Sequence, residues 1–173
     1  METNIANVTR ENNVESMWDS PIGGAYLIWR FVTGYAAVRD SGPNMLLVYP
    51  ALAIVMDSSF ATEISRASNL ADFAFAFHDS SGSRAKSLSG LQERIIAQRD
   101  WVLKSIEFAL VTRLVELDTE TAALHVVLEK ESASSVRLAR DFKDNEGLNA
   151  ELLGRVFART QDNDIAYYLG VKF

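Results

Sequence analysis

The chain of 173 residues contains no cysteine and only two histidines. Without cysteine there are no disulfide bonds, thiolate zinc sites or cysteine nucleophiles, which fits a reducing compartment. The histidines, His78 and His125, are far apart in the sequence. His78 precedes Asp79 and Ser80, but neighbours along a chain do not face one another as a catalytic triad requires. We expect both histidines to be ordinary loop or strand residues, and the protein not to be an enzyme.

Phosphate-binding glycine loops and long hydrophobic runs are also missing. The chain has neither Gly-x-x-x-x-Gly-Lys-Ser/Thr nor a Gly-x-Gly-x-x-Gly that opens a helix, so it is not a P-loop ATPase by itself. The longest apolar run, Met45 to Met56, spans 12 residues and contains Pro50. About 20 residues would be needed to cross a bilayer. Residues 1–15 are polar and form no signal peptide, so we expect a soluble cytoplasmic protein.

Composition and charge are those of a globular domain with an excess of acid. Hydrophobic residues make up 48% of the chain and charged residues 23%, and the net charge is −6. This balance argues against a chain built to lie on polyanions. We expect a flexible leader over residues 1–16 and a single compact domain over 17–173. That domain divides into a helical N-terminal part (17–79), a long helix with a β-hairpin (84–131), and C-terminal helices with a docked tail (134–173).

An aromatic helix is expected near the start of the domain. Asp19-Ser20-Pro21 supplies capping residues and a proline suited to the first helical position. Apolar residues at spacings of three and four then predict an amphipathic helix to about Arg39. Ser41-Gly42-Pro43 should end it.

Three further segments complete the N-terminal part. The apolar run over 45–56 fits either a short strand before Pro50 or a kinked buried helix, because periodicity cannot separate the two when every side chain is apolar. A weak helix should cover 59–68. The segment 70–77, with its three phenylalanines Phe73, Phe75 and Phe77, should be buried whichever state it adopts.

The middle of the chain predicts a long helix that leads into a hairpin. Apolar residues at helical spacing run from Leu88 to Leu114. The later half should lie deeper in the core, because its apolar face widens through Trp101, Leu103, Phe108 and Val111. Alternating apolar residues predict strands over 114–118 and 122–129, joined by a loop longer than a tight turn. The expected fold class is therefore mainly α with a small β-hairpin (α+β), a helical domain with a winged-helix-like unit.

Beyond the hairpin, Ser134-Ser135 can cap a short helix through Leu138 and Phe142, ended by residues 144–147. The alternative is one longer helix interrupted near Gly147. A further apolar stripe covers 148–157. Residues 165–173 fit either a last helical turn or an edge strand.

The C-terminal end is unusually apolar. A terminus is normally polar and frayed, because ordering it must be offset by burial. We expect this one to be docked on its own core or on another chain. Leu153 to Arg159 should form a helix with Leu153, Val156 and Phe157 facing inward. Gly154 should permit close approach of another backbone, and Arg155 and Arg159 should share an exposed face.

Two sets of residues are candidates for binding. Tryptophan and tyrosine are favoured interface anchors, and Trp29 and Phe31 are too close in sequence to share one helix face, so at least one should meet a partner or a second layer. The partner-interface candidates are Trp18, Trp29, Phe31, Arg155, Arg159, Tyr167, Tyr168 and Phe173. The nucleic-acid candidates are Arg84, Lys86, Arg94 and Arg99, which lie in a locally basic stretch. The alternative for this stretch is an ordinary solvated helix face with paired charges. The acidic pairs Asp118/Glu120, Glu129/Glu131 and Asp162/Asp164 are expected to be solvated charges rather than metal ligands.

Several segments match, in order over residues 18–173, the pattern of a known family. They are Ser20-Pro21, Gly34-Tyr35, Leu46 to Val55 around Pro50, Trp101 to Leu117, Leu153-Gly154-Arg155-Val156-Phe157-Ala158-Arg159 and Leu169-Gly170-Val171-Lys172. Together they resemble the small middle component of bacterial three-component ABC (ABC-3C) systems, often encoded beside an SMC-like ABC ATPase. Val156 stands where that family usually has an aromatic residue, and Lys172-Phe173 replaces its usual Arg-Pro ending.

The resemblance implies a non-catalytic adaptor that links an SMC/ABC-type ATPase to an effector, expected to be nuclease-like. The setting would be a bacterial anti-phage and anti-plasmid defence complex of the Lamassu type. ATP and magnesium would belong to the partner ATPase, and this chain would need no cofactor or metal. DNA is a further candidate within the complex, and a membrane is not. The alternative function is a winged-helix DNA-binding protein, acting as a regulator or as the DNA-contacting arm of the complex.

Overall fold

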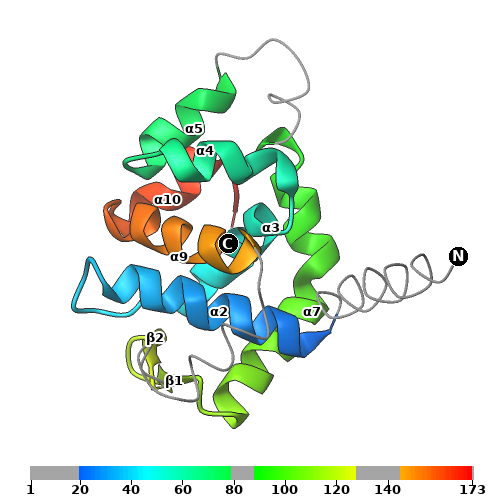
Figure 1. The fold of residues 1–173 in the computed structure, drawn as a ribbon, viewed down its shortest axis with the longest axis vertical. Helices are drawn as coiled ribbons and strands as arrows, with labels where there is room; N and C mark the ends of the chain where they lie inside the picture. Colours follow the sequence, from blue (N-terminus) through cyan, green and yellow to red (C-terminus); the bar gives the residue numbers. More distant parts are fainter. Residues whose placement is uncertain (1–19, 79–87, 128–144, 173) are drawn as a thin grey trace, which may run out of the picture.

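The described part of the chain is a helical domain with one β-hairpin (Figure 1). Residues 20–78, 88–127 and 145–172 are described in this computed structural model. Their elements are, in chain order, α2 (Pro21–Ala36), a 3-10 turn (Met45–Leu47), α3 (Val48–Val55), a second 3-10 turn (Ser58–Phe60), α4 (Ala61–Arg66), α5 (Leu70–His78), α7 (Leu91–Val111), β1 (Val115–Asp118), β2 (Ala123–Val126), α9 (Asn145–Ala158) and α10 (Asp162–Leu169). The expected mainly α fold with a small β-hairpin is confirmed. The leader over 1–16 and the short helix expected from Ser134 lie outside the described residues.

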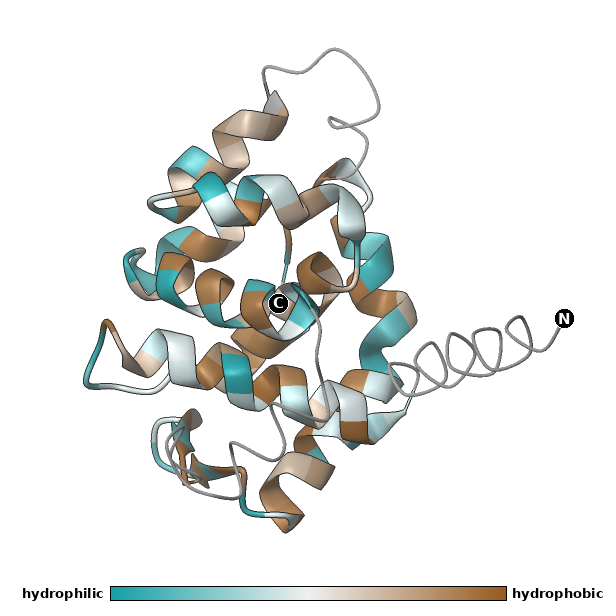
Figure 2. Cartoon of the chain, viewed as in Figure 1, coloured by the Kyte–Doolittle hydropathy of each residue, from teal (hydrophilic) through white to brown (hydrophobic). Residues whose placement is uncertain are grey.

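Helix α2 is the central element of the fold. Ser20 caps it by accepting a hydrogen bond from the Gly23 N–H at 3.3 Å, and Pro21 occupies the first turn, as the sequence predicts. The helix packs against α9, α7, α3 and strand β2, so almost every residue from Gly23 to Tyr35 is buried. A helix that is apolar on all sides requires such cover. In Figure 2 the hydrophobic residues gather on α2, α3 and α9, where these helices meet.

Helices α2 and α9 approach each other closely because each has a glycine at the contact. A β-carbon added at Gly34 would overlap the Glu151 carbonyl of α9. One added at Gly154 would overlap the Phe31 carbonyl of α2 and lie 2.8 Å from the Tyr35 nitrogen. The close backbone approach expected at Gly154 is therefore confirmed, and its partner is α2.

We expect Gly154→Ala to lower the free energy of unfolding by about 3 kcal/mol, the upper end for overpacking, because the atoms it meets are backbone and cannot turn aside. Thermal and urea unfolding followed by circular dichroism measure this loss. Gly170→Ala is the matched control. Gly170 has φ 65° and no heavy atom within 4 Å of an added β-carbon. It should lose only about 1 kcal/mol, from backbone strain. Equal losses in the two variants would contradict the close contact.

The apolar run over 45–56 is helical, so the strand alternative is wrong. It starts as a 3-10 turn capped by Asn44, whose side chain accepts from the Leu46 N–H at 3.0 Å, and continues as α3 with Pro50 in its first turn. The weak helix expected over 59–68 is present as the second 3-10 turn and α4. Among the described residues, no single helix is both long and apolar enough to cross a bilayer. The neighbouring helical stretches Met45–Val55 and Ser58–Arg66 are together long and apolar enough, and they are bent by 88° relative to each other.

Helix α5 is only partly buried, which corrects the expectation for 70–77. Phe73 and Phe77 are buried with Phe60, at ring-centroid distances of 5.0 to 5.8 Å. Phe75 is 66% exposed. Residues four apart share a helix face, so burial of Phe73 and Phe77 turns Phe75 outward.

Helix α7 leads into the hairpin, as predicted. Strands β1 and β2 pair antiparallel with Asp118 opposite Ala123, which leaves a four-residue loop rather than a tight turn. The outer edge of β2 is held by the α2–α3 connection, because the Leu124 N–H donates to the Pro43 carbonyl at 2.9 Å. The later half of α7 is not uniformly deeper in the core, contrary to expectation: Leu103 and Val111 are 53% and 76% exposed.

The C-terminal helices pack on the core formed by the preceding elements. Residues 145–147 are helical and belong to α9, so no helix ends at these positions. Leu153, Val156 and Phe157 face inward as predicted, with exposures of 0%, 3% and 0%.

The tail is helical rather than an edge strand. Helix α10 ends at Gly170, which adopts the left-handed conformation typical of a helix C-terminus. Ile165, Leu169 and Val171 are buried, and the Lys172 N–H donates to the Gln92 side chain at 2.8 Å. The tail is thus docked on its own chain.

Candidate partner-docking surface

An exposed aromatic surface lies where α5 and α10 meet. Phe75 is 66% exposed and Tyr167 is 82% exposed, and Tyr168 is half-buried beside them. Each is turned outward because its neighbours fill the core: Phe73 and Phe77 in α5, and Ile165 and Leu169 in α10. We call Ala71, Phe75, Tyr167 and Tyr168 the α5–α10 surface.

The α5–α10 surface is hollowed rather than flat. Phe75, Tyr167 and Tyr168 line a cavity of about 420 Å³, together with Ala71 and Ala74. The two tyrosine rings stand edge to face with centroids 5.6 Å apart. Tyr168 also lines two adjoining hollows of about 340 Å³ each. Exposed aromatic groups around a hollow are typical of protein-binding sites.

Polar groups surround this surface. Asp164 and Arg159 line one adjoining hollow, and the Arg159 guanidinium donates to the Ser68 carbonyl at 2.8 Å. The start of α10 is fixed by Asp162, which accepts from the Tyr35 hydroxyl at 3.1 Å and from Arg39 at 3.0 Å. Burial, and then the Asp162 carboxylate, raise the pKa of Tyr35 above its usual value, so the hydroxyl remains a neutral donor.

The interface candidates are divided by the structure. Tyr167 and Tyr168 come together at the α5–α10 surface, and Arg159 lines the hollow beside it. Trp29 and Phe31 are 0% and 2% exposed, which corrects their assignment to a partner interface. Of the two alternatives for this pair, a partner or a second layer, the second layer is observed, because neighbouring elements cover both sides of α2. Trp18 and Phe173 lie outside the described residues.

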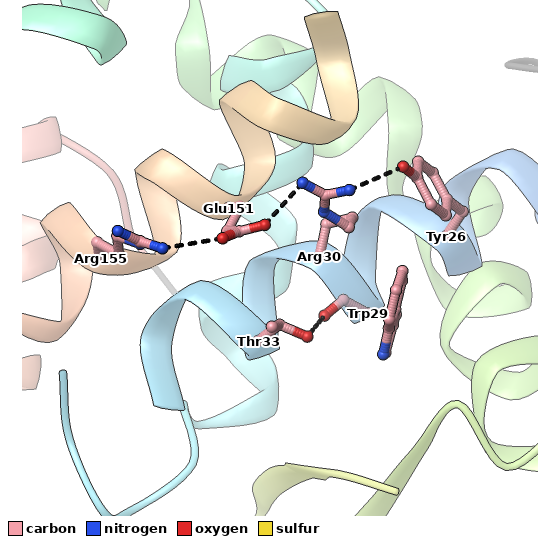
Figure 3. A network of polar contacts seen from close by, with 6 residues as sticks. All are labelled: Tyr26, Trp29, Arg30, Thr33, Glu151 and Arg155. Carbon is pink, nitrogen blue, oxygen red and sulfur yellow. Dashed lines mark hydrogen bonds and ion pairs between the residues drawn. The ribbon is translucent and has the colours of Figure 1, made fainter. Parts of the chain in front are cut away.

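Arg155 belongs to a polar network between α2 and α9 (Figure 3). Glu151 is central to it, with one carboxylate oxygen 2.6 Å from the Arg30 guanidinium and the other 2.9 Å from Arg155. Arg30 also donates to the Tyr26 hydroxyl at 3.2 Å and lies about 6 Å from the centroid of the Trp29 ring. These contacts join the two helices, so the network has a structural role.

The nucleic-acid candidates do not form one patch in the described residues. Arg94 pairs with Asp57 at 2.7 Å and its guanidinium lies over the Phe60 ring, 5.2 Å from the centroid. Binding of Arg94 to a phosphate would have to displace these contacts. Arg99 is exposed on α7. Arg84 and Lys86 lie outside the described residues.

In the described ranges no group of three or more candidate metal ligands occurs around the acidic pairs. Asp118 instead caps the hairpin loop. It accepts from the Thr121 hydroxyl at 2.7 Å and from the Glu120 N–H at 2.9 Å, and these bonds hold its pKa below the usual value. His125 is half-buried in β2. Glu129 and Glu131 lie outside the described residues.

Phe75 is the surface residue that sequence reasoning missed. The sequence predicts burial of the whole segment 70–77, because the segment is strongly apolar. Helical spacing gives the signal that distinguishes Phe75, since positions 73 and 77 share a face with Leu70 and position 75 does not.

The comparisons with known proteins agree with the resemblance in the sequence. The model of the family described as ABC-three component (ABC-3C) system Middle Component 3 matches residues 9–173. Comparisons with curated proteins and with solved structures give no match. A match over nearly the whole chain establishes membership. The chain belongs to the family of Middle Component 3 proteins of ABC-three component systems.

Proposed function

We propose that this chain is a non-catalytic adaptor that links an SMC/ABC-type ATPase to a nuclease-like effector. Membership of the middle-component family supports the proposal, because it implies an ABC-type ATPase and another component as partners. The complex would act in the cytoplasm against phage and plasmid DNA, as in Lamassu-type systems. ATP and magnesium would bind to the ATPase, and this chain would contribute no catalytic group, cofactor or metal.

The α5–α10 surface is the observation that best supports an adaptor role. An isolated domain gains nothing from an 82% exposed tyrosine beside a 66% exposed phenylalanine. Aromatic side chains of this kind carry much of the binding energy in protein interfaces once they are buried. The surface is built on two helices whose opposite faces are in the core, so packing fixes the helix backbones that carry these side chains. Backbone that is already ordered loses little further conformational entropy on binding.

We expect the double variant Phe75→Ser/Tyr167→Ser to fold normally and to lose one partner. Each substitution at an exposed site should change the free energy of unfolding by no more than about 0.5 kcal/mol. Each should cost about 2 kcal/mol of binding, or about 30-fold in affinity. Co-expression with the ATPase and effector of the same system, followed by affinity purification, measures the loss.

The control for this experiment is Val38→Ser, which replaces a 41% exposed apolar residue just after α2. It should leave co-purification unchanged. If the wild-type chain never co-purifies with either component, the adaptor proposal is wrong. If the double variant assembles as well as wild type, the α5–α10 surface is not the docking site.

The second candidate function is a winged-helix DNA-binding protein. A long helix that runs directly into a hairpin favours it, whereas the engagement of Arg94 by Asp57 weakens it. Duplex-DNA binding that falls with salt and with Arg84, Lys86 and Arg99 replaced by glutamate would support it. Absence of binding at low salt would exclude it.

A further inference from the structure

The two helices of the α5–α10 surface are far apart in the sequence, so contacts between distant segments must set one against the other. α5 follows the connection 67–69 after α4, and α10 follows the connection 159–161 after α9. Hydrogen bonds join these two connections directly, one from Arg159 and one to Thr160. We call residues 159–161 the α9–α10 junction. The two helices are therefore held together where both of them begin.

Thr160 is the buried polar residue of this junction, with an exposure of 7%. Its hydroxyl accepts a hydrogen bond from the Leu70 N–H at 3.3 Å and donates to the Val156 carbonyl at 3.4 Å. Leu70 is the first residue of α5, and the N–H groups of a first helical turn have no partner within their own helix. The Thr160 hydroxyl thus caps α5 from a position 90 residues away in the sequence.

The junction is also bonded to α2. The Thr160 carbonyl accepts from the Arg39 guanidinium at 2.9 Å, and Arg39 donates as well to the Asp162 carboxylate in the first turn of α10. The Tyr35 hydroxyl donates to the same carboxylate at 3.1 Å. The start of α10 is therefore fixed on α2, and the start of α5 is fixed on the same base through Thr160.

A small tilt of α5 at the junction would displace its docking side chain by a large distance. Phe75 lies five residues after Leu70, which is about 7.5 Å along a helix. A tilt of about 15° at Leu70 would therefore move the backbone of Phe75 by about 2 Å. Residues of both helices line the hollow at the surface, so its width would change with this tilt. Interface cores are packed as densely as protein interiors, so such a displacement would separate Phe75 from a partner.

We propose that Thr160 is a positioning residue of the α5–α10 surface, whose hydroxyl holds the start of α5 on the junction and so sets the hollow between Phe75 and Tyr167. Thr160 is itself buried, so it acts on a partner only through these aromatic side chains. The inference rests on the proposed function in one respect, because the alignment of the two helices affects binding only if a partner docks there.

Thr160→Val tests the hydroxyl, because valine has nearly the same shape and no hydrogen-bonding group. We expect the Leu70 N–H to lose its partner and the amides of α5 to exchange with solvent about ten-fold faster, the equivalent of one hydrogen bond. Hydrogen exchange of the full chain, followed by mass spectrometry, measures this without any partner. Thr160→Ser keeps the hydroxyl and should restore the wild-type exchange rate.

Thr33→Val is the matched control. Thr33 is a half-buried threonine whose hydroxyl donates at 2.7 Å to the Trp29 carbonyl of its own helix (Figure 3). Its loss should leave exchange in α5 unchanged. Unchanged exchange in α5 of Thr160→Val, or an equal increase across α2, α7 and α9, would overturn the proposal.

A second variant covers the case in which Thr160→Val does not fold. Arg159 is exposed, and its guanidinium donates to the Ser68 carbonyl at 2.8 Å, which joins the same two connections. Arg159→Met should therefore fold and should also raise exchange selectively in α5. An exchange pattern identical to that of the wild-type chain would then overturn the proposal.

Binding measurements test whether Thr160 acts through the aromatic side chains. The affinity is measured by titration with the purified component that Phe75→Ser/Tyr167→Ser fails to co-purify. We expect Thr160→Val to weaken binding about ten-fold, Thr160→Ser to restore it and Thr33→Val to leave it unchanged. In a Phe75→Ser background, Thr160→Val should cost less than about two-fold more, because the side chain it positions is gone. A further loss as large as in the wild-type background would overturn the proposal.

The two measurements also separate this inference from the proposed function. If the wild-type chain binds neither component, the adaptor role fails, and hydrogen exchange alone decides whether Thr160 holds α5 in place. If Phe75→Ser/Tyr167→Ser loses a partner but Thr160→Val binds as tightly as the wild-type chain, the adaptor role and its docking site stand. The positioning role of Thr160 is then overturned.

Discussion

A chain truncated after Gln161 should lose its stable fold. The truncation removes Ile165, Leu169 and Val171, whose side chains are 0%, 2% and 5% exposed. Burying one such side chain contributes about 1.5 to 3 kcal/mol. Losing all three should cost about 5 kcal/mol or more, a large part of the 5 to 15 kcal/mol that typically stabilises a domain. The truncation also uncovers the face of α5 against which α10 packs.

Soluble yield and thermal unfolding followed by circular dichroism measure this result. A chain that ends at Val171 is the matched control, because it keeps all three buried side chains. It loses the Lys172 hydrogen bond to Gln92, worth about 1 kcal/mol. It should therefore stay folded with a slightly lower melting temperature. A truncation after Gln161 that unfolds at the wild-type temperature would show that the tail does not stabilise the domain.

The second large effect is expected for Glu151→Ala. The Glu151 and Arg30 side chains are 5% and 12% exposed and their charged groups are 2.6 Å apart. Removing the carboxylate leaves the Arg30 guanidinium buried without its counter-ion. Breaking a buried pair in this way costs about 3 to 5 kcal/mol. Urea unfolding of the purified variant measures the change in the free energy of unfolding.

Two further variants show whether the unpaired charge is the cause. Arg30→Met/Glu151→Met replaces the pair with apolar side chains, and it should recover most of the stability because no buried charge remains. Arg155→Ala should cost less than about 1 kcal/mol, since the Arg155 side chain is 44% exposed. A double variant as unstable as Glu151→Ala would mean that packing, and not charge, explains the loss.

These stability variants differ in kind from the docking variants. Glu151 and the tail residues act within the core, so their substitution should lower stability and all binding together. Phe75 and Tyr167 lie at the surface, so their substitution should change partner binding while the fold persists.

The sequence predicted local structure well wherever one signal was strong. Ser20-Pro21 gave the start of α2, the seven-residue stretch Leu153–Arg159 gave the inward face of α9, and alternating residues gave the hairpin. These succeeded because capping and periodicity act between residues close along the chain. For residues 45–56 the sequence does not distinguish a strand from a helix, because a segment that is apolar at every position carries no periodicity.

The candidate site was predicted only in part. Tyr167, Tyr168 and Arg159 were named from the sequence, yet nothing in the sequence placed Phe75 beside them. Trp29 and Phe31 are candidates because one helix face cannot hold both, and the structure buries both because several elements pack around α2.

By itself, the sequence determined the helical class, the hairpin, the docked C-terminus and the family to which the chain belongs. Only the tertiary structure decided which apolar residues remain exposed. Whether Phe75, Leu103 and Val111 are core or surface depends on which other helices pack against α5 and α7. For α7 that choice is made by packing against α2 and α3, and for α5 largely by packing against α10, all of which are distant in sequence. Periodicity assigns a residue to a face of its own helix, and long-range packing determines which face is covered.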